Sequence, residues 1–346
     1  MTRNGRTIRA RAPLRLGFAG GGTDVSPFSD EYGGFVLNAT IDKYVYTTIS
    51  SRDDGLVELL AADGQMSWSG PASRALPSVK GLELLAGVYN RILRQFGYHE
   101  PLSISIVTHS EAPPGSGLGS SSTMVVALIQ AFCEYLALPL GDYDIAHLAY
   151  EVERVDLGFA GGKQDQYAAA FGGLNFMEFY RDRVIVNPLR IKQNHRAELE
   201  SSLLLFYTGV SRESANIINE QVQNVTSGNG HSLQAMHDLK AEALQMKEAL
   251  LKGNLDAVAT AMRVSWEAKK KMANKISNQK INEIYETAMK EGARAGKVSG
   301  AGGGGYMMFI VDPVKRSRVI RCLREFSGCV STCNFVEQGV DSWRVK

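Results

Sequence analysis

Carboxylates, hydroxyls and basic side chains in this chain stand beside glycine-rich segments, a combination suited to phosphate chemistry. Residues 113–123 read PPGSGLGSSST, between an alternating apolar run at 102–108 and an amphipathic run at 120–137. Glycines let backbone N–H groups approach an anion, and a helix N-terminus adds partial positive charge. The hydroxyls that follow can cap the helix or bind phosphate or Mg²⁺. This pattern predicts a phosphate-binding loop between a strand and a helix.

Two better-known glycine-rich loops are excluded by the residues present. A Walker A loop ends in Gly-Lys-Ser/Thr, but Gly119 is followed by Ser120, and 113–123 contains no lysine. The dinucleotide fingerprint G-x-G-x-x-G, started at Gly115, requires glycine where Ser120 stands. An NAD-dependent oxidoreductase is therefore not expected. The alternative, that residues 113–123 form a purely structural turn, is less favoured because two further glycine clusters occur in the chain.

These clusters lie near the two ends of the chain. Residues 11–24 read RAPLRLGFAGGGTD, and residues 297–306 read KVSGAGGGGY. Glycine inside a regular element costs about 0.5–1 kcal/mol relative to alanine. Three dense clusters therefore indicate that the backbone approaches ligands closely.

Acidic residues that could serve phosphoryl transfer lie just before the middle of the chain. Asp165 stands after glycines at the start of a helix expected at 164–171, and Glu151 and Glu153 precede it on a helix expected at 142–155. Phosphoryl transfer needs a nucleotide cradle, metal ligands, a cation and a group that orients the acceptor. From the residues alone, an acid that merely favours the helix dipole is the preferred interpretation of Asp165.

Length, composition and charge fit an ordinary two-domain protein. The chain has 346 residues, 44% hydrophobic residues and a net charge of +2, so neither nucleic acid nor an anionic membrane is an expected partner. No signal-peptide pattern or long apolar run occurs, and four cysteines show no zinc-site spacing, which together favour a cytoplasmic protein. Whether the chain forms a homodimer is left open.

The pattern of elements predicts an α+β fold whose composition changes near 188–200. We expect a domain at 1–188 and a second at 189–346, with a loop at 63–80 in the first. Strand, helices, strand, helix and strand suit a ferredoxin-like sandwich in the second. The expected strands are 6–17, 34–60, 102–108, 175–179, 184–186, 203–207, 306–311 and 330–336, and the expected helices are 81–96, 120–137, 142–155, 164–171, 213–225, 232–252, 254–273, 278–295 and 313–326.

Taken together, the three glycine-rich segments resemble the signature motifs of the GHMP kinases, the family of galactokinase, homoserine kinase, mevalonate kinase and phosphomevalonate kinase. Their order and spacing match over nearly the whole chain, and the middle motif is highly specific. The resemblance implies an N-terminal α/β domain like domain 2 of ribosomal protein S5, a ferredoxin-like C-terminal domain, and an active site in the cleft between them.

The resemblance also implies site residues. Asp165, followed by Gln166, matches the catalytic aspartate, and Arg15, nine residues before Asp24, matches an arginine near the acceptor oxygen. Ser121 and Glu153 match the Mg²⁺ ligands, with Ser122 and Glu151 as alternatives if the register shifts. The nucleotide is expected on the loop residues Pro114, Gly115, Ser116, Gly117, Leu118, Gly119, Ser120, Ser121, Ser122 and Thr123.

The segment Phe18–Asp24 further resembles sugar kinases that act on D-glycero-D-manno-heptose 7-phosphate, which implies ATP-dependent phosphorylation of the anomeric hydroxyl to give the 1,7-bisphosphate for nucleotide-activated heptose synthesis. A kinase for an unphosphorylated sugar such as fucose is one alternative, and a non-catalytic sugar- or nucleotide-binding regulator is another. Lys269–Lys271 is interpreted as a solvated helix face. The expected substrate-binding residues are Gly21, Gly22, Thr23, Asp24, Lys163, Arg212, Gly302 and Gly303.

Overall fold

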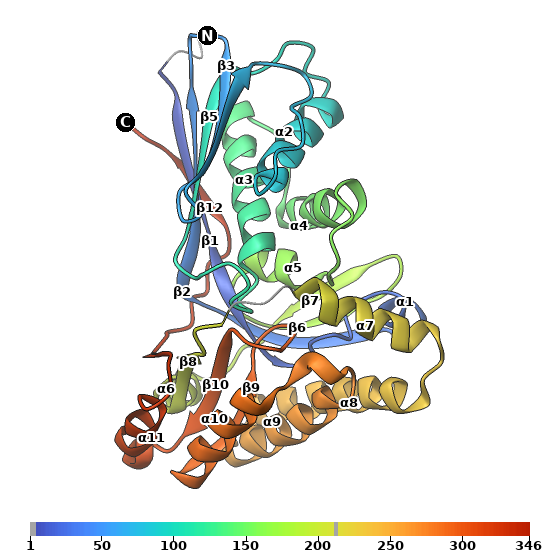
Figure 1. Cartoon of the computed structure of the whole chain (residues 1–346), viewed down its shortest axis with the longest axis vertical. Helices are drawn as coiled ribbons and strands as arrows, with labels where there is room; N and C mark the ends of the chain where they lie inside the picture. Colours follow the sequence, from blue (N-terminus) through green and yellow to red (C-terminus); the bar gives the residue numbers. More distant parts are fainter. Residues whose placement is uncertain (1–4, 211–213) are drawn as a thin grey trace.

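The computed structural model describes residues 5–210 and 214–346, which form two sheets with helices packed on them (Figure 1). The larger sheet has the strand order β12-β1-β2-β5-β3-β4, and a hairpin of β6 and β7 pairs with β2. Its strands are β1 (Thr7–Ala19), β2 (Gly34–Ser51), β3 (Leu56–Ala61), β4 (Met66–Pro71), β5 (Ile104–Ser110), β6 (Leu174–Phe179), β7 (Val184–Pro188) and β12 (Asp341–Arg344).

Helices α2, α3, α4 and α5 lie beside the larger sheet in Figure 1. They span Glu83–Gln95, Ser120–Leu136, Asp142–Tyr150 and Gln164–Phe171. Ile8, Ile49 and Ile106 of the sheet form one buried cluster with Val126 and Phe132 of α3. This cluster fixes α3, and hence the loop that precedes it, against the sheet.

The smaller sheet has the strand order β11-β8-β10-β9, and its central strands β8 and β10 are buried on both faces. Leu204 and Phe206 of β8 face one apolar cluster, while Leu203 and Leu205 face another, as the two-residue period of a strand requires. Its elements are α6 (Gln193–Ser202), β8 (Leu203–Tyr207), α7 (Ser214–Thr226), α8 (Gly230–Lys252), α9 (Leu255–Lys270), a 3₁₀ turn (Asn274–Ile276), α10 (Gln279–Lys290), β9 (Ala293–Val298), β10 (Tyr306–Val311), a second 3₁₀ turn (Pro313–Lys315), α11 (Arg316–Leu323) and β11 (Cys329–Ser331).

One apolar cluster is shared by the two sheets. Leu14, Leu16 and Phe18 of β1 belong to the same buried cluster as Leu205 of β8 and Met308 of β10. The chain crosses between the sheets twice, once through α6 and once after β11, where it returns as β12 to pair with β1. The two-domain α/β arrangement is therefore confirmed, whereas a division at residue 188 stays a prediction.

The elements that were not predicted from the sequence are those whose residues have weak preferences for helix or strand. The predicted loop at 63–80 contains the edge strand β4, whose sequence MSWSGP includes glycine and proline. The helix predicted at 278–295 ends at Lys290, and β9 follows; its alanines and glycine are weak strand formers that pairing with β10 holds extended. The predicted strand at 330–336 is the shorter β11, and α6 and β12 were not predicted.

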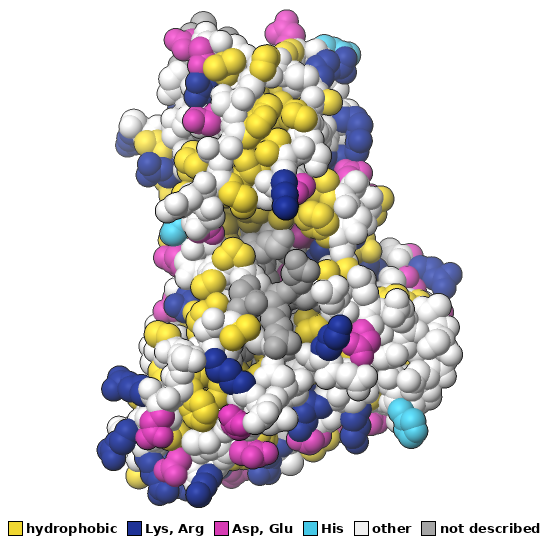
Figure 2. All heavy atoms as spheres, in the orientation of Figure 1, with side chains coloured by type: hydrophobic (Ala, Val, Ile, Leu, Met, Phe, Trp, Pro, Cys, Tyr) yellow, Lys and Arg dark blue, Asp and Glu magenta, His cyan; other side chains and the backbone are white. Residues whose placement is uncertain are grey.

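In the described part of the chain, none of the helices is both long enough and apolar enough to cross a membrane. On the face shown in Figure 2, Lys and Arg side chains alternate with Asp and Glu at the end that carries α10 and α11. This interspersed pattern matches the small net charge of the sequence.

Candidate functional site

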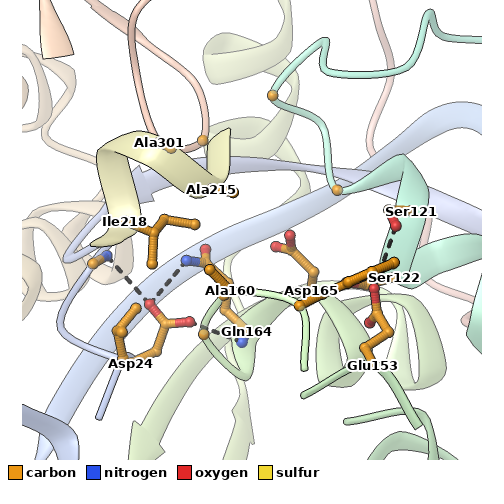
Figure 3. Close-up of a pocket in the computed structure, with 18 of the residues that line it drawn as sticks. Asp24, Ser121, Ser122, Glu153, Ala160, Gln164, Asp165, Ala215, Ile218 and Ala301 are labelled. Atoms are coloured by element: carbon orange, nitrogen blue, oxygen red, sulfur yellow. Dashed lines mark hydrogen bonds between the residues drawn. The ribbon is translucent and has the colours of Figure 1, made fainter. Parts of the chain in front are cut away.

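A cavity of about 700 Å³ opens where loops of the two sheets meet (Figure 3). Its walls come from the end of β1, the loop before α3, the segment before α5, the helix α7, the end of α9 and the loop after β9. Twelve residues predicted for the site line it: Arg15, Gly22, Asp24, Pro114, Gly115, Gly117, Gly119, Ser120, Ser121, Ser122, Glu153 and Asp165.

The predicted phosphate loop is clamped against the glycine-rich loop that precedes β10. Tyr306 donates its backbone N–H to the Ser116 carbonyl at 2.8 Å, and the Ser299 hydroxyl donates to the Gly117 carbonyl at 3.0 Å. Gly117 has φ +81°, and a Cβ on it would lie 2.5 Å from the backbone carbonyl oxygen of Ser299, so only glycine fits there. Two of the three glycine-rich segments thus form one wall, and the N-terminus of α3 faces the cavity beside them.

Arg15 and Asp165 form an ion pair at the centre of the cavity. Two nitrogens of the Arg15 guanidinium lie 2.7 and 2.6 Å from Oδ1 of Asp165, and Nη1 donates to the Gly117 carbonyl at 2.7 Å. The Arg15 side chain is 4% exposed and that of Asp165 is 22% exposed. Register shifts in β1 flank Arg15 and turn this strand residue into the cleft. The pair joins the phosphate loop to α5.

Asp24 lies on the other side of the cavity from the phosphate loop, as Figure 3 shows. Its carboxylate accepts hydrogen bonds from the backbone N–H of Gln164 at 3.0 Å, the Gln164 side-chain amide at 3.0 Å and the backbone N–H of Gly22 at 3.2 Å. Burial raises the pKa of Asp24 above its ordinary value, and the Gln164 hydrogen bond opposes this shift. A polar ligand reaching Asp24 would therefore meet a fixed, desolvated acid.

Glu153 and Ser121 come together at the opposite end. Residues Glu151–Asp156 form a π-helix that directly continues α4, and this turn buries the Glu153 side chain completely. The Ser121 hydroxyl lies 3.3 Å from Oε1 of Glu153, and the Gln166 amide donates to Oε2. Burial raises the pKa of Glu153, and the adjacent Arg154 guanidinium opposes the shift.

These two oxygen ligands fit Mg²⁺. Mg²⁺ usually takes one or two protein ligands and completes its shell with water and substrate phosphates. Burial disfavours the ionised form of the Glu153 carboxylate. A bound cation would stabilise that ionised form. Among residues 5–210 and 214–346 there is no cluster of three His, Cys, Asp or Glu side chains that could hold a metal without such help.

The other predicted site residues that the structure describes do not line the cavity. Leu118 is buried in the apolar cluster shared by the sheets, and the Thr23 hydroxyl closes the turn by bonding to the Gly20 and Phe35 carbonyls. Gly303 bonds to the Ile276 carbonyl. Gly21, Ser116, Thr123 and Gly302 are likewise not part of the cavity lining, and Arg212 lies outside the described residues.

Lys163 is held outside the cavity lining. Its ammonium donates to the Tyr180 carbonyl at 3.2 Å and lies 3.7 Å from an oxygen of Asp30. It also lies over the ring of Tyr150, 5.5 Å from the centroid. A contact between Lys163 and the substrate remains a prediction.

Two buried lysines near the cavity were not expected. Lys269 lines it and is 3% exposed, so the interpretation of Lys269–Lys271 as a solvated face is wrong for this residue. Burial and the nearby Arg15 lower the pKa of Lys269 to about 8. Lys297 is also buried and donates to the Phe18 carbonyl at 3.0 Å; burial lowers its pKa well below the ordinary value. The KxSGAG spacing places Lys297 next to the third glycine cluster, which could have drawn attention to it.

The geometry, with an anion-binding loop, a paired carboxylate and two metal-type ligands around one cavity, is that of a phosphotransferase. Residues 83–173 match the GHMP kinases N terminal domain and residues 246–328 match the GHMP kinases C terminal domain. The chain belongs to the GHMP kinase family, whose members use ATP.

Relatives within the family are similar over full length. The chain is 47% identical over 341 residues to a D-glycero-alpha-D-manno-heptose 7-phosphate kinase of Campylobacter jejuni, covering 98% of this chain and 100% of that protein. A crystal structure of a D-glycero-D-manno-heptose 1-phosphate kinase from Bacteriodes thetaiotaomicron has a TM-score of 0.84 at 44% identity, with 98% and 99% covered. A bifunctional fucokinase/GDP-fucose pyrophosphorylase of Arabidopsis thaliana is 26% identical over 91% of this chain and 31% of its own length.

Proposed function

We propose that this chain is an ATP-dependent kinase that phosphorylates the anomeric hydroxyl of D-glycero-D-manno-heptose 7-phosphate and yields the 1,7-bisphosphate. One observation carries the proposal: the Arg15–Asp165 pair stands between the phosphate loop and Asp24 in a single cavity. A phosphoryl donor on one side and a polyhydroxyl acceptor on the other would meet at that pair. The full-length similarity to a heptose 7-phosphate kinase supports this acceptor.

Each polar residue has a role that follows from its surroundings. The glycine-rich loop and the N-terminus of α3 bind the nucleotide phosphates through backbone N–H groups. Asp165 orients the acceptor hydroxyl and accepts its proton, and Arg15 stabilises negative charge that develops in the transition state. Asp24 accepts hydrogen bonds from sugar hydroxyls because ionised carboxylates are acceptors only.

Glu153 and Ser121 would hold Mg²⁺, which neutralises charge on the ATP phosphates when it is bound. Arg154 keeps the Glu153 carboxylate in place, since Nη1 lies 3.7 Å from Oε1 and Nη2 donates to the Ser122 hydroxyl at 3.3 Å. The Arg154 guanidinium thus partly offsets the cost of burying the Glu153 carboxylate at the cavity wall.

A coupled assay of ADP release tests the proposal. Purified protein receives ATP and MgCl₂ with heptose 7-phosphate, heptose 1-phosphate or fucose, and ³¹P NMR identifies the carbon that gains phosphate. We expect the highest kcat/KM with heptose 7-phosphate and an anomeric phosphate in the product. Preferred use of fucose or heptose 1-phosphate would refute the assigned acceptor. ATP binding without turnover of any sugar would favour the non-catalytic regulator.

A further inference from the structure

A sugar that already bears a phosphate requires a cationic partner in its binding site. The two candidates named from sequence do not supply one among the described residues. Lys163 is bonded to the Tyr180 carbonyl and faces Asp30, outside the cavity lining. Arg212 lies beyond the part of the chain that the structure describes. If the proposed function holds, the partner must be sought among the cations that do face the cavity.

In residues 5–210 and 214–346, three cationic side chains line the cavity: Arg15, Arg154 and Lys269. Arg15 is committed to Asp165 and to the Gly117 carbonyl. Arg154 lies at the end of the cavity that carries Glu153. Its guanidinium contacts Glu153, the Ser122 hydroxyl and the carbonyls of Ala160 and Gly162. Lys269 alone of these three has no carboxylate within ion-pair distance among the described residues.

Lys269 comes from the last turn of α9, which packs on the smaller sheet, and reaches across to the larger one. Its ammonium donates to the Gly300 carbonyl. An ammonium has three N–H donors, so this contact leaves two for a ligand. A Cβ built on Gly21 would lie 3.4 Å from Nζ, which places the charge against the turn that presents Asp24. The ammonium thus lies between the Gly300 carbonyl and the turn that presents Asp24.

We propose that Lys269 binds the phosphate group carried by the sugar substrate and thereby selects a phosphorylated over an unphosphorylated acceptor. This inference rests on the proposed function, since Asp165 marks the hydroxyl that is phosphorylated and Asp24 marks the ring hydroxyls. A lysine presented from the smaller sheet then contacts the phosphate that the sugar already carries. The substrate itself bridges the two halves of the site.

The electrostatics around Lys269 favour the binding of an anion. Burial lowers the pKa of Lys269 to about 8, Arg15 adds to the shift, and Asp24 and Asp165 oppose it without cancelling it. Lys269 has no ion-pair partner among the described residues, so a bound phosphate dianion would supply the opposite charge and favour the protonated ammonium.

Lys269→Met tests the proposal, because methionine keeps the length of the side chain and removes the charge. Lys270→Met is the matched control: this neighbour lies 2.8 Å from Glu267 and is not in the cavity lining. A charged hydrogen bond contributes about 1.5–3 kcal/mol, so Kd and KM for heptose 7-phosphate should rise about 10- to 150-fold in Lys269→Met. We expect unchanged KM for ATP, and a kcat/KM for unphosphorylated heptose within a factor of about three, since no contact to that acceptor is lost.

Equal losses with heptose 7-phosphate and with unphosphorylated heptose would overturn the proposal and assign Lys269 to the transferred phosphoryl group. Calorimetry at pH 8 in buffers of different ionisation enthalpy provides a second readout that does not need turnover. Wild-type protein should take up protons when heptose 7-phosphate binds, because the dianion raises the pKa of Lys269, and Lys269→Met should not. Equal proton uptake by both proteins would also overturn it.

The outcomes separate this inference from the proposed function. A wild-type protein that neither binds nor uses heptose 7-phosphate contradicts the function itself. A wild-type protein that uses it, with Lys269→Met behaving as wild type, contradicts only the role of Lys269. Lys269→Arg, which keeps the charge, should recover part of the affinity, and thermal melting shows whether each variant is folded.

Discussion

Replacing Asp165 by asparagine separates its chemical role from its structural one. The change keeps the shape of the side chain and removes both the negative charge and the proton acceptor. General-base assistance contributes about 10²–10⁴-fold to a rate, so kcat should fall by that factor while KM for ATP stays nearly constant. ADP release at saturating heptose 7-phosphate measures the change directly.

The same substitution has a predictable effect on stability. Arg15 is 4% exposed, so loss of its partner leaves a buried guanidinium. Complete loss of a buried partner costs about 3–5 kcal/mol. Asparagine still offers an acceptor oxygen, and Arg15 keeps its bond to the Gly117 carbonyl, so we expect a loss of about 1–2 kcal/mol in Asp165→Asn. Asp165→Ala, which has no acceptor, should approach the larger value, and denaturant unfolding compares the two.

Asp156→Asn is a suitable control for both measurements. Asp156 is 24% exposed, close to the 22% of Asp165, and its carboxylate pairs with Arg91 at 2.9 Å, outside the cavity lining. Its replacement should lower stability slightly and leave kcat intact. The reasoning fails if Asp165→Asn retains kcat within about tenfold of wild type, below the range for a lost base, and Asp165 would then serve only the helix dipole and Arg15.

Three further changes test other parts of the site. Gly117→Ala puts a Cβ 2.5 Å from a backbone oxygen, so ATP affinity in fluorescence titrations should fall at least about tenfold, whereas Gly97→Ala, where nothing lies within 4 Å, should not change it. Glu153→Gln should raise the Mg²⁺ concentration for half-maximal rate about tenfold or more; the same effect in Glu151→Gln instead would move the metal ligand by two residues. Lys297→Met removes a buried amine whose protonation is disfavoured by burial, so it should raise the unfolding free energy at pH 7 by about 1 kcal/mol or more. Because the folded-state pKa of Lys297 is depressed, wild-type stability should rise with pH between that pKa and about 10.4. The difference in melting temperature between Lys297→Met and wild type should therefore shrink over this pH range. A difference that does not change with pH would contradict a depressed pKa at Lys297.

Most of the site was predictable because its residues lie in contiguous segments with a strong local signal. The loop at 113–123, the turn before Asp24 and the segment before Asp165 each combine glycines with functional side chains, and each lines the cavity. Lys269 was missed for a physical reason. Its two lysine neighbours in sequence suggest a solvated surface, and its burial arises only when α9 packs against β9 and the end of β1.

The fold shows the same division between local and tertiary information. Branched and aromatic residues indicated an extended segment at 34–60, but the structure divides it into β2 and β3, with a break at 52–55. β9 and β12 were not predicted, because their extended conformation comes from pairing with β10 and β1 rather than from their own residues. Lys163 shows that closeness in sequence to Asp165 does not determine where a side chain points. Its ammonium is directed to the Tyr180 carbonyl.

The two chain crossings and the shared apolar cluster have a mechanical consequence. Two bodies joined at two points can rotate only about the line through those points, and here Leu16, Phe18, Leu205 and Met308 fill the space along which they would separate. Large hinge bending would expose this apolar surface to water at about 25 cal/mol per Å². The enzyme should therefore behave as a nearly rigid clamp, whose radius of gyration in solution X-ray scattering stays the same when nucleotide and sugar phosphate bind.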